Sequence, residues 1–345
     1  MRPVAFVTRA FAGCRAKMFA MCEQMFGPDS VDVYRMASAP SDIEFLGTDV
    51  DHTYEKSPDE VIDEVLKHEY IHGFCDQSAL LKPLVDADVP FIAHQHDVFG
   101  MREADYFEPF LHMAPKAVSV FTSQAHRDYV FGRWNLPFGD SHLIFNLPVM
   151  AWQPEIPKPR VKIDRSLVYF GGVNTDPSAN TGYRFYLPQW RRLVEAGVKV
   201  HIYTHGQLSR GLYSTYRSHP LMFIHQRIPH HRLYEEISQY TVGFNGYNNI
   251  GGVPKAWCDF APTCVPNKAF DYMFAGIPTL SYNLGESLKY ALPWTVPRDH
   301  VDQLVDGFEK ATTLKIDYEK HRKEWCMETQ LPAIKDIYAQ VRRKL

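Results

Sequence analysis

The chain has 345 residues, of which 45% are hydrophobic and 22% are charged, and its formal net charge is −3. This composition is typical of a soluble globular protein, and the length is too great for one small core, so we expect two domains. The near-neutral charge gives no general electrostatic argument for nucleic-acid binding. The sequence has no run of about 20 apolar residues, which is the length that crosses a membrane.

The six cysteines are scattered, and no two of them form a Cys-x-x-Cys pair. This pattern favours neither a disulfide framework nor a zinc ribbon, so a reducing cytoplasm is the expected location. Residues 1–8 carry one charge and a short apolar run, which predicts a first β-strand and not a signal peptide.

Apolar runs alternate with helix-length segments through the first half of the chain. We predict strands at 3–8, 70–74, 89–93, 117–123 and 142–148, and helices at 16–26, 57–68, 78–87 and 124–131. This alternation predicts a parallel sheet covered by helices. The loop after the first strand contains Gly13 but lacks Gly-x-Gly-x-x-Gly, so it is not a dinucleotide-binding motif. The backbone at Gly13 is a candidate for facing an acceptor or donor phosphates.

Polar residues follow the predicted strand 89–93, where the sequence reads His94-Gln95-His96-Asp97. Ligands collect at the carboxyl ends of parallel strands, so His96 and Asp97 are candidate site residues. Metal binding is one alternative, but no second His or Cys cluster has a matching spacing, and we expect no metal. The other alternative is that His96 and Asp97 only cap a helix or satisfy the backbone of a loop.

Residues 153–160 contain three prolines and cannot continue a helix or a central strand. We therefore place a first domain at 1–150 and a second at 163–317. In the second domain we predict strands at 166–170, 198–203, 221–224, 241–244 and 279–282, helices at 186–196, 231–239 and 307–314, and a final helical segment at 318–345. The first of these strands runs into Gly171 and Gly172, whose backbone N–H groups can approach a phosphate closely.

The most specific pattern lies between Pro266 and Pro278, where a helix-length run precedes Gly276. Lys268 and Asp271 are three residues apart in its first turn, so they share one face near the helix N-terminus. That terminus favours an anion such as a diphosphate. The lysine would neutralise phosphate, and the acid would accept hydrogen bonds from ribose hydroxyls. A plain surface ion pair at a helix start is the alternative.

This Pro-x-Lys-x-x-acid-Tyr-x-x-x-Gly-x-Pro pattern resembles the nucleotide-sugar-binding segment of GT-B glycosyltransferases of the large, mostly retaining group 1 (family four-like) family. The segment Val-Pro-Phe-Ile-Ala-His-Gln-His-Asp, which ends at Asp97, and the strand that ends at Gly171 resemble further segments of the same family. The resemblance covers nearly the whole chain, although only residues 266–278 are fairly specific. Many members carry two glutamates eight residues apart. Here Asp271 aligns with the second and Thr263 with the first, which indicates a divergent member.

The resemblance implies an α/β chain of GT-B architecture, with two Rossmann-like domains facing each other across a cleft that holds the active site. It implies that segment 318–345 packs back on the first domain. It also implies a hexosyl- or pentosyltransferase that moves a sugar from a UDP- or GDP-sugar to a hydroxyl acceptor with retention. No tightly bound cofactor is expected.

The resemblance also assigns roles to particular residues. The catalytic candidates are His96, Asp97 and Lys268; the donor-binding candidates are Gly171, Gly172, Arg184, Arg227, Lys268 and Asp271; the acceptor-side candidates are Gly13, His96 and Asp97. Among these, Arg184 is the nearest cation downstream of the diglycine.

Several alternatives stay open at this point. The acceptor is a saccharide, a lipid-linked molecule or a modified nucleic acid, and peripheral association with a membrane is compatible with the second of these. The function alternatives are transfer to a modified base in DNA, sugar-phosphate epimerisation or phosphorolysis, and an inactive nucleotide-binding scaffold, which Thr263 makes credible.

Overall fold

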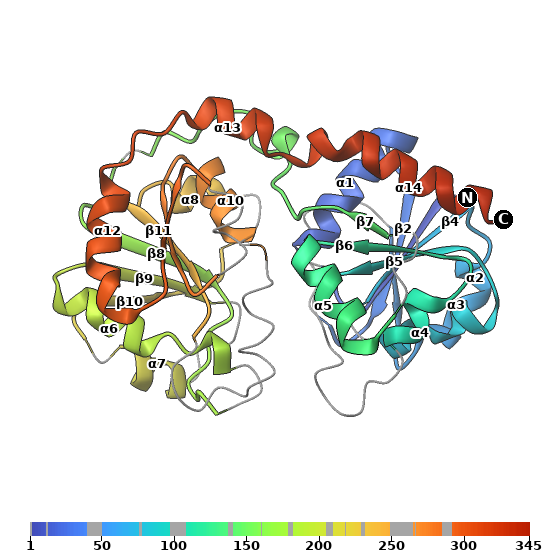
Figure 1. Ribbon diagram of the computed structural model, residues 1–345, viewed down its shortest axis with the longest axis horizontal. Coiled ribbons are helices and arrows are strands. Elements are labelled where there is room, and N and C mark those ends of the chain that lie inside the picture. Colours follow the sequence, from blue (N-terminus) through green and yellow to red (C-terminus); the bar gives the residue numbers. More distant parts are fainter. Residues whose placement is uncertain are drawn as a thin grey trace. The chain divides into compact units, whose positions relative to one another are not determined.

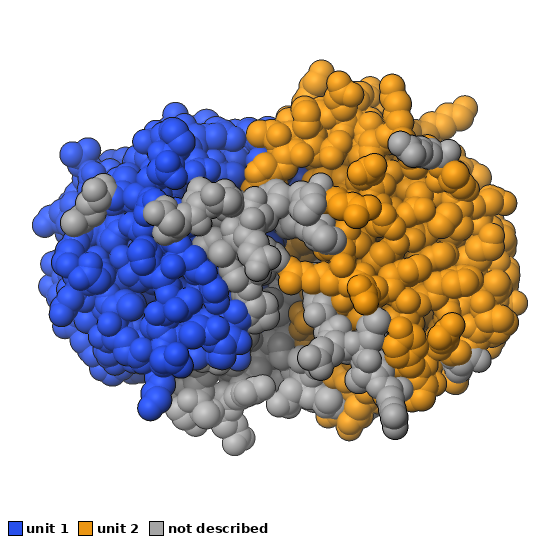
Figure 2. All heavy atoms as spheres, turned by 180° about the vertical axis from the view of Figure 1, so that it is seen from behind, with its two compact units in different colours: residues 1–149, 326–345 blue, residues 150–325 orange. Residues whose placement is uncertain are grey.

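The computed structural model describes residues 2–11, 13–39, 50–75, 78–96, 108–136, 141–159, 161–178, 182–204, 210–217, 219–228, 232–248, 265, 267–284 and 292–345. Contacts divide the chain into two compact units, which Figure 2 shows in different colours. Unit 1 comprises residues 1–149 and 326–345, and unit 2 comprises residues 150–325. Each unit is a parallel sheet covered by helices (Figure 1).

The sheet of unit 1 has seven parallel strands in the order β3-β2-β1-β4-β5-β6-β7. The strands are β1 (Val4–Thr8), β2 (Val31–Met36), β3 (Asp51–Tyr54), β4 (Tyr70–Phe74), β5 (Phe91–Gln95), β6 (Ala117–Phe121) and β7 (Ser141–Leu143). Every residue of β1, β4, β5 and β6 is buried, as expected for central strands that helices cover on both faces. The chain reverses its direction of progress between β1 and β4, which places the switch point of this sheet there.

The helices of unit 1 are α1 (Cys14–Phe26), α2 (Ile62–Val65), α3 (Lys82–Asp86), α4 (Glu108–Met113), α5 (Gln124–Trp134) and α14 (Leu331–Arg343). α5 begins where the Ser123 hydroxyl accepts a hydrogen bond from the His126 amide, and it ends at Asn135 in the left-handed region. α14 is amphipathic and packs against β4, β5, β6 and α1 (Figure 1). The last segment of the chain thereby completes the core of unit 1.

The sheet of unit 2 has six parallel strands in the order β10-β9-β8-β11-β12-β13. The strands are β8 (Ser166–Gly171), β9 (Lys199–Thr204), β10 (Met222–His225), β11 (Val242–Gly246), β12 (Thr279–Tyr282) and β13 (Thr295–Arg298). The helices are α6 (Leu187–Glu195), α7 (Arg210–Tyr216), α8 (Leu233–Ile237), α10 (Asn267–Phe274), α12 (Leu304–Thr312) and α13 (Tyr318–Glu324), with a 3-10 turn, η5 (Gly182–Arg184), before α6. Both sheets contain the six-strand Rossmann order, so each unit has a switch point of its own.

The structure differs from the sequence-based prediction in several elements, and helices α4 and α7 are among those that were not predicted. Strands β2, β3 and β13 were not predicted, because all three mix polar with apolar residues and β3 and β13 have only four residues each; β3, for example, reads Asp-His-Thr-Tyr. The expected single segment 318–345 is also divided. α13 belongs to unit 2, because the following Trp325 packs against Phe270 and Trp294 there. Only the part from Cys326 onward belongs to unit 1.

Candidate functional site

The topology of unit 2 singles out the carboxyl ends of β8 and β11. These neighbouring strands form the switch point, because the chain leaves β8 toward β9 on one side and leaves β11 toward β12 on the other. In open parallel sheets, ligands bind in the crevice that such a divergence leaves. β8 ends in Gly171 and is followed by Gly172, so the two glycines lie at the position where a ligand is expected.

Two cationic side chains converge on these glycines. A β-carbon at Gly171 would lie 3.0 Å from Lys268 Cε and 3.6 Å from its Nζ. A β-carbon at Gly172 would lie 2.7 Å from Arg184 Nη1. Lys268 comes from α10 and Arg184 from η5, so segments more than 80 residues apart supply positive charge to one backbone turn. The absence of side chains at the turn is what leaves room for both cations.

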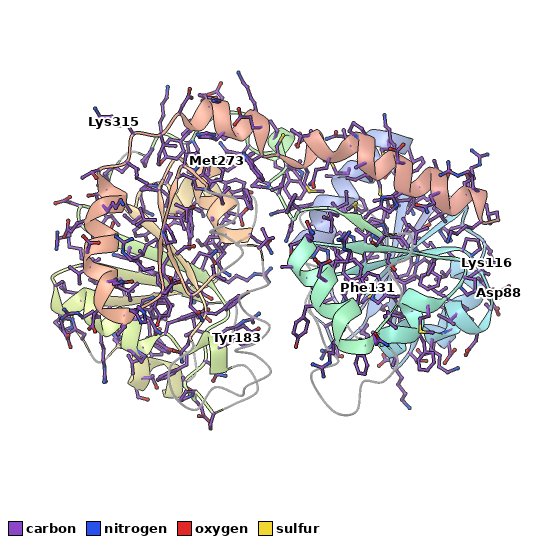
Figure 3. All side chains as sticks on the ribbon, in the orientation of Figure 1. Asp88, Lys116, Phe131, Tyr183, Met273 and Lys315 are labelled. Carbon is purple, nitrogen blue, oxygen red and sulfur yellow. The ribbon has the colours of Figure 1, made fainter. Side chains whose placement is uncertain are left out.

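Tyrosine rings line this cationic turn. The hydroxyl of Tyr169 donates a hydrogen bond to the Gly172 carbonyl, 2.8 Å away, and Lys268 Nζ lies 5.5 Å from the centre of the Tyr169 ring. Arg184 Cζ lies 5.1 Å from the ring centre of Tyr183, which Figure 3 labels. Burial raises the pKa of Tyr169, and the charge of Arg184 opposes that rise. The Tyr169 ring therefore stays neutral at physiological pH, and both rings contact the cations through their faces without neutralising them.

The position of Lys268 depends on how α10 is anchored. Tyr272 lies one turn after Lys268 on the same helical face, and its hydroxyl donates to the carbonyl oxygens of Phe244 (2.9 Å) and Val168 (3.1 Å). Its ring covers Gly243, where a β-carbon would lie only 2.2 Å from the ring. One side chain thus ties α10 to β8 and β11 together. This tie fixes α10 against both strands, and Lys268, one turn earlier, lies beside Gly171 at the end of β8.

Asp271 lies on the same helix and is 6% exposed. Its Oδ1 accepts a hydrogen bond from the hydroxyl of Tyr234 in α8, at 3.1 Å. The carboxylate is therefore held in place close to the first turn of α10, as a partner for ligand hydroxyls would need to be. Its predicted role on the ribose stays a prediction.

Arg227 occupies a different place from the other predicted donor-binding residues. It is exposed and follows β10, the edge strand, which lies two strands away from β8. Neighbouring strands are about 4.8 Å apart, so its backbone lies roughly 10 Å to the side of the diglycine. The structure brings together Gly171, Gly172, Arg184 and Lys268, and Arg227 is not shown to join them.

The acceptor-side candidates lie in unit 1. His96 directly follows β5, and Gly13 is the N-cap of α1, with φ +56° and no atom of the described residues within 4 Å of an added β-carbon. Asp97 and Thr263 lie outside the described residues. Within the described ranges, no three His, Cys, Asp or Glu side chains are grouped so that they would hold a metal ion. Over the same part of the chain, every helix falls short of the length and apolar character that crossing a bilayer requires.

Sequence reasoning missed the tyrosines of the site. Tyr169 lies within an apolar segment, where an aromatic residue usually signals core packing, and Tyr183 stands between Gly182 and Arg184 with no pattern that marks it. Tyr272 is part of the Lys268 pattern, but its partners Val168 and Phe244 are distant in the chain. One signal was available in the sequence: Tyr272 lies four residues after Lys268, which is one helical turn. The hydroxyl of a buried tyrosine needs a hydrogen-bond partner, so this residue indicated a polar contact close to the lysine.

The two Rossmann-like units, each with its own switch point, define the GT-B fold. No protein-family model and no curated protein matches the sequence. Among solved structures, the chain is similar to Anabaena Alr3699/HepE in complex with UDP and glucose, with a TM-score of 0.72 and 10% identity over 98% of this chain and 100% of that chain.

Two further structures show how wide this fold class is. One is an alpha-glucosyltransferase in complex with UDP-glucose and DNA containing an abasic site, with a TM-score of 0.60 and 12% identity over 98% of this chain and 99% of that chain. The other is UDP-GlcNAc 2-epimerase from Methanocaldococcus jannaschii, with a TM-score of 0.54 and 8% identity over 91% of this chain and 94% of that chain. At such identities the likeness establishes the fold, and the chemistry must be argued from the site.

Proposed function

We propose that the protein is a glycosyltransferase whose unit 2 binds a nucleoside-diphosphate sugar. The observation that carries this proposal is the convergence of Lys268 and Arg184 on the diglycine at the switch point of β8 and β11. A diphosphate is the ligand that suits two fixed cations, a turn without side chains and a helix N-terminus. Among the described residues no carboxylate forms an ion pair with Arg184, which supports its proposed role on the diphosphate.

The chemistry follows from this arrangement. When the bond between the sugar and the diphosphate breaks, negative charge grows on the departing phosphate. Cations that are already in position stabilise this charge more in the transition state than in the ground state, which accelerates the reaction. Lys268 and Arg184 would supply this stabilisation, and Asp271 would orient the ribose. Neither role requires a metal ion.

The first donor to test is UDP-glucose. The solved structure of Alr3699/HepE is a complex with UDP and glucose, and that of the alpha-glucosyltransferase is a complex with UDP-glucose and DNA. We assign the acceptor hydroxyl to unit 1, where His96 and Asp97 match the segment that lies on the acceptor side in the resembling family. A retaining course, in which the leaving phosphate takes the acceptor's proton on the same face of the sugar, belongs to the same proposal.

The experiment is a measurement of UDP released from UDP-glucose, with and without mixed saccharide acceptors. Lys268→Ala should lower the rate about a hundredfold or more, the loss expected when one preorganised charge is removed from a transition state. Lys315→Ala is the matched control, because Lys315 is exposed on another side of unit 2 (Figure 3). Equal rates for wild type and Lys268→Ala would contradict the proposal.

Transfer to a modified base in DNA is the second candidate, and the DNA-bound alpha-glucosyltransferase favours it. The net charge of −3 offers no global attraction to a polyanion, so such binding would depend on local cations. Including duplex DNA that contains hydroxymethylated bases in the acceptor mixture tests this candidate. Conversion of UDP-sugar to an epimer without UDP release would instead indicate the activity of the third similar structure.

A further inference from the structure

Two buried polar side chains lie near the carboxyl ends of β11 and β12. Asn245 is 6% exposed and Ser281 is 2% exposed, and the two residues are register partners on these neighbouring strands. The amide Nδ2 of Asn245 and the hydroxyl Oγ of Ser281 are both buried and have no hydrogen-bond partner among the described residues. β11 is one of the two strands at the switch point of unit 2, so this pair lies at the edge of the sheet where a ligand is expected.

The alternation of side chains along β11 places Asn245 on the face of the sheet that α10 covers. A β-carbon at Gly243 would lie 2.2 Å from the Tyr272 ring, so Gly243 faces α10. Asn245 is two residues further along the strand and faces the same way, whereas Phe244 belongs to the hydrophobic core on the opposite face. Ser281 shares the face of its register partner, and α10 packs against both strands.

Spacing along the strand and along the helix brings the pair close to Lys268. Asn245 lies about 6.6 Å beyond Gly243 toward the edge of the sheet, and Lys268 lies one helical turn, about 6 Å, before Tyr272. Because Lys268 also lies beside Gly171 at the end of β8, the first turn of α10 is at the same carboxyl edge. The pair is therefore beside this first turn, on the side of Lys268 that faces β12.

The burial of these two groups has a cost in the ligand-free protein. A buried amide or hydroxyl has given up its hydrogen bonds to water, and without a new partner it destabilises the fold. Buried polar groups in folded proteins are nearly always hydrogen-bonded, and the exceptions are concentrated at functional sites, where a ligand supplies the missing partner. Asn245 and Ser281 therefore indicate a ligand position next to the first turn of α10.

The chemistry of the pair favours a neutral ligand group. A carboxamide offers two N–H donors and one acceptor oxygen, and a hydroxyl both donates and accepts. Neither group is charged, and Lys268 and Arg184 already provide two cations for a diphosphate. Groups that donate and accept side by side are complementary to the hydroxyls of a sugar. A nucleotide sugar carries ribose at one end of its diphosphate and the transferred sugar at the other, and the proposed function assigns the ribose to Asp271.

We infer that Asn245 and Ser281 bind hydroxyl groups of the sugar that is transferred. This inference rests on the proposed function, because it places a nucleotide sugar at Lys268. A sugar hydroxyl that meets both side chains supplies the hydrogen bonds that they lack. A sugar without that hydroxyl leaves a buried polar group unpaired, and sites that hydrogen-bond a substrate hydroxyl reject such analogues strongly. The pair thereby contributes to the choice of the donor sugar.

Calorimetric titration of UDP and of UDP-glucose into wild type, Asn245→Leu and Ser281→Ala separates the sugar from the nucleotide. We expect the Kd of UDP-glucose to rise about tenfold in each variant, which is the loss of about one hydrogen bond, and the Kd of UDP to change less than about twofold. Both substitutions replace a polar side chain by an apolar one of similar or smaller size, so neither adds bulk to the site.

Thr279 on β12 provides the matched control. Its Oγ1 is also buried without a partner in the described part of the chain, but Thr279 pairs with Gly243, one step further from the edge of the sheet. Thr279→Val should leave the Kd values of UDP and UDP-glucose unchanged. A loss of UDP-glucose affinity equal to that of Ser281→Ala would show that the effect comes from repacking of β12, and it would contradict the inference.

Urea denaturation of the ligand-free variants gives a readout that needs no nucleotide. Asn245→Leu and Ser281→Ala remove polar groups that lack a partner, so their urea midpoints should equal or exceed that of wild type. Lower midpoints in both variants would show that the two side chains are satisfied inside the folded protein, and this result would overturn the inference.

Two binding results would also overturn it. An equal loss of affinity for UDP and UDP-glucose would assign the pair to the diphosphate, and unchanged affinity for both would show that neither side chain meets the donor. Failure of UDP to bind the wild-type protein would count against the proposed function. The urea midpoints would still decide separately whether Asn245 and Ser281 are groups that await a ligand.

Discussion

A β-carbon at Gly171 would lie 3.0 Å from Cε of Lys268, so the last residue of β8 and the first turn of α10 touch through the lysine stem. Gly171 also adopts φ +134°, a backbone conformation that L side chains rarely adopt. The close approach and the backbone angle both depend on glycine. The placement of the lysine charge at the sheet edge therefore depends on a residue that has no side chain of its own.

Gly171→Ala should weaken UDP binding about tenfold and lower the free energy of unfolding by about 1–3 kcal/mol. The new methyl group would displace Lys268, and the backbone would be strained at this φ. Calorimetry and urea denaturation measure the two effects. Gly132→Ala is the control: its β-carbon meets no atom within 4 Å in the part of the chain that the structure describes, and alanine in helix α5 should stabilise by about 0.5–1 kcal/mol. UDP affinity equal to wild type in Gly171→Ala would contradict the site geometry.

Tyr272→Phe should destabilise the protein by about 1–3 kcal/mol, because the buried hydroxyl that bonds to the carbonyl oxygens of Val168 and Phe244 would be lost. It should also weaken UDP binding, since α10 would lose its tie to the two strands at the site. Urea denaturation and UDP titration on the same variant separate these two effects. A stable variant with normal UDP affinity would show that Tyr272 does not position Lys268.

Asp271→Asn tests the proposed contact with the ribose. Asparagine keeps an oxygen that can accept from Tyr234 but loses the negative charge that strengthens bonds from ribose hydroxyls. UDP should bind about tenfold more weakly, whereas 2′,3′-dideoxy-UDP should bind wild type and variant equally. Tyr234→Phe, which keeps the carboxylate, is the control and should affect UDP less. An equal loss for both nucleotides would exclude a ribose contact.

Stability should fall steeply below pH 6.5. Burial lowers the pKa of His72 and of His201 to about 3, and the charges of His225 and Lys199 assist at His201. The unfolded chain takes up these protons near pH 6.5, so between pH 3 and 6.5 it binds more protons than the folded protein, and acid favours unfolding. Each such histidine should cost about 2 kcal/mol between pH 7 and 5.

His201→Gln should make this pH dependence shallower by up to about 1.4 kcal/mol per pH unit. Urea denaturation at pH 5, 6, 7 and 8 gives the slope. The measurement at pH 8, where histidines are neutral in both states, is the internal control for the cost of the substitution itself. A slope identical to wild type would show that His201 takes up its proton in the folded protein.

The sequence predicted the parts of the site that are local in the chain. Lys268 and Asp271 follow from the spacing within one helix, and Gly171 follows from an apolar run that ends in two glycines. Arg184 was predicted only as the nearest downstream cation, and the structure places its guanidinium at Gly172. The roles of these residues in binding and catalysis stay predictions.

Contacts between distant segments could not be predicted in the same way. Tyr338 meets His72 across 266 positions of sequence, and Tyr272 meets Val168 across 104. Local patterns of hydrophobicity carry no information about such partners, because the topology of the sheets decides which strand ends meet. For the same reason the pattern around His96 suggested a site but did not reveal its buried partners.

The most direct test compares UDP, GDP and ADP with their parent nucleosides as stabilisers of wild type and Lys268→Ala. A nucleotide at about 100 times its Kd should add about 2.7 kcal/mol to the free energy of unfolding. We predict that one diphosphate stabilises wild type, that Lys268→Ala loses most of this effect, and that the parent nucleoside acts equally weakly on both proteins. Stabilisation by the diphosphate that is the same in wild type and Lys268→Ala, or absent in both, would contradict a diphosphate site at Gly171 and Lys268.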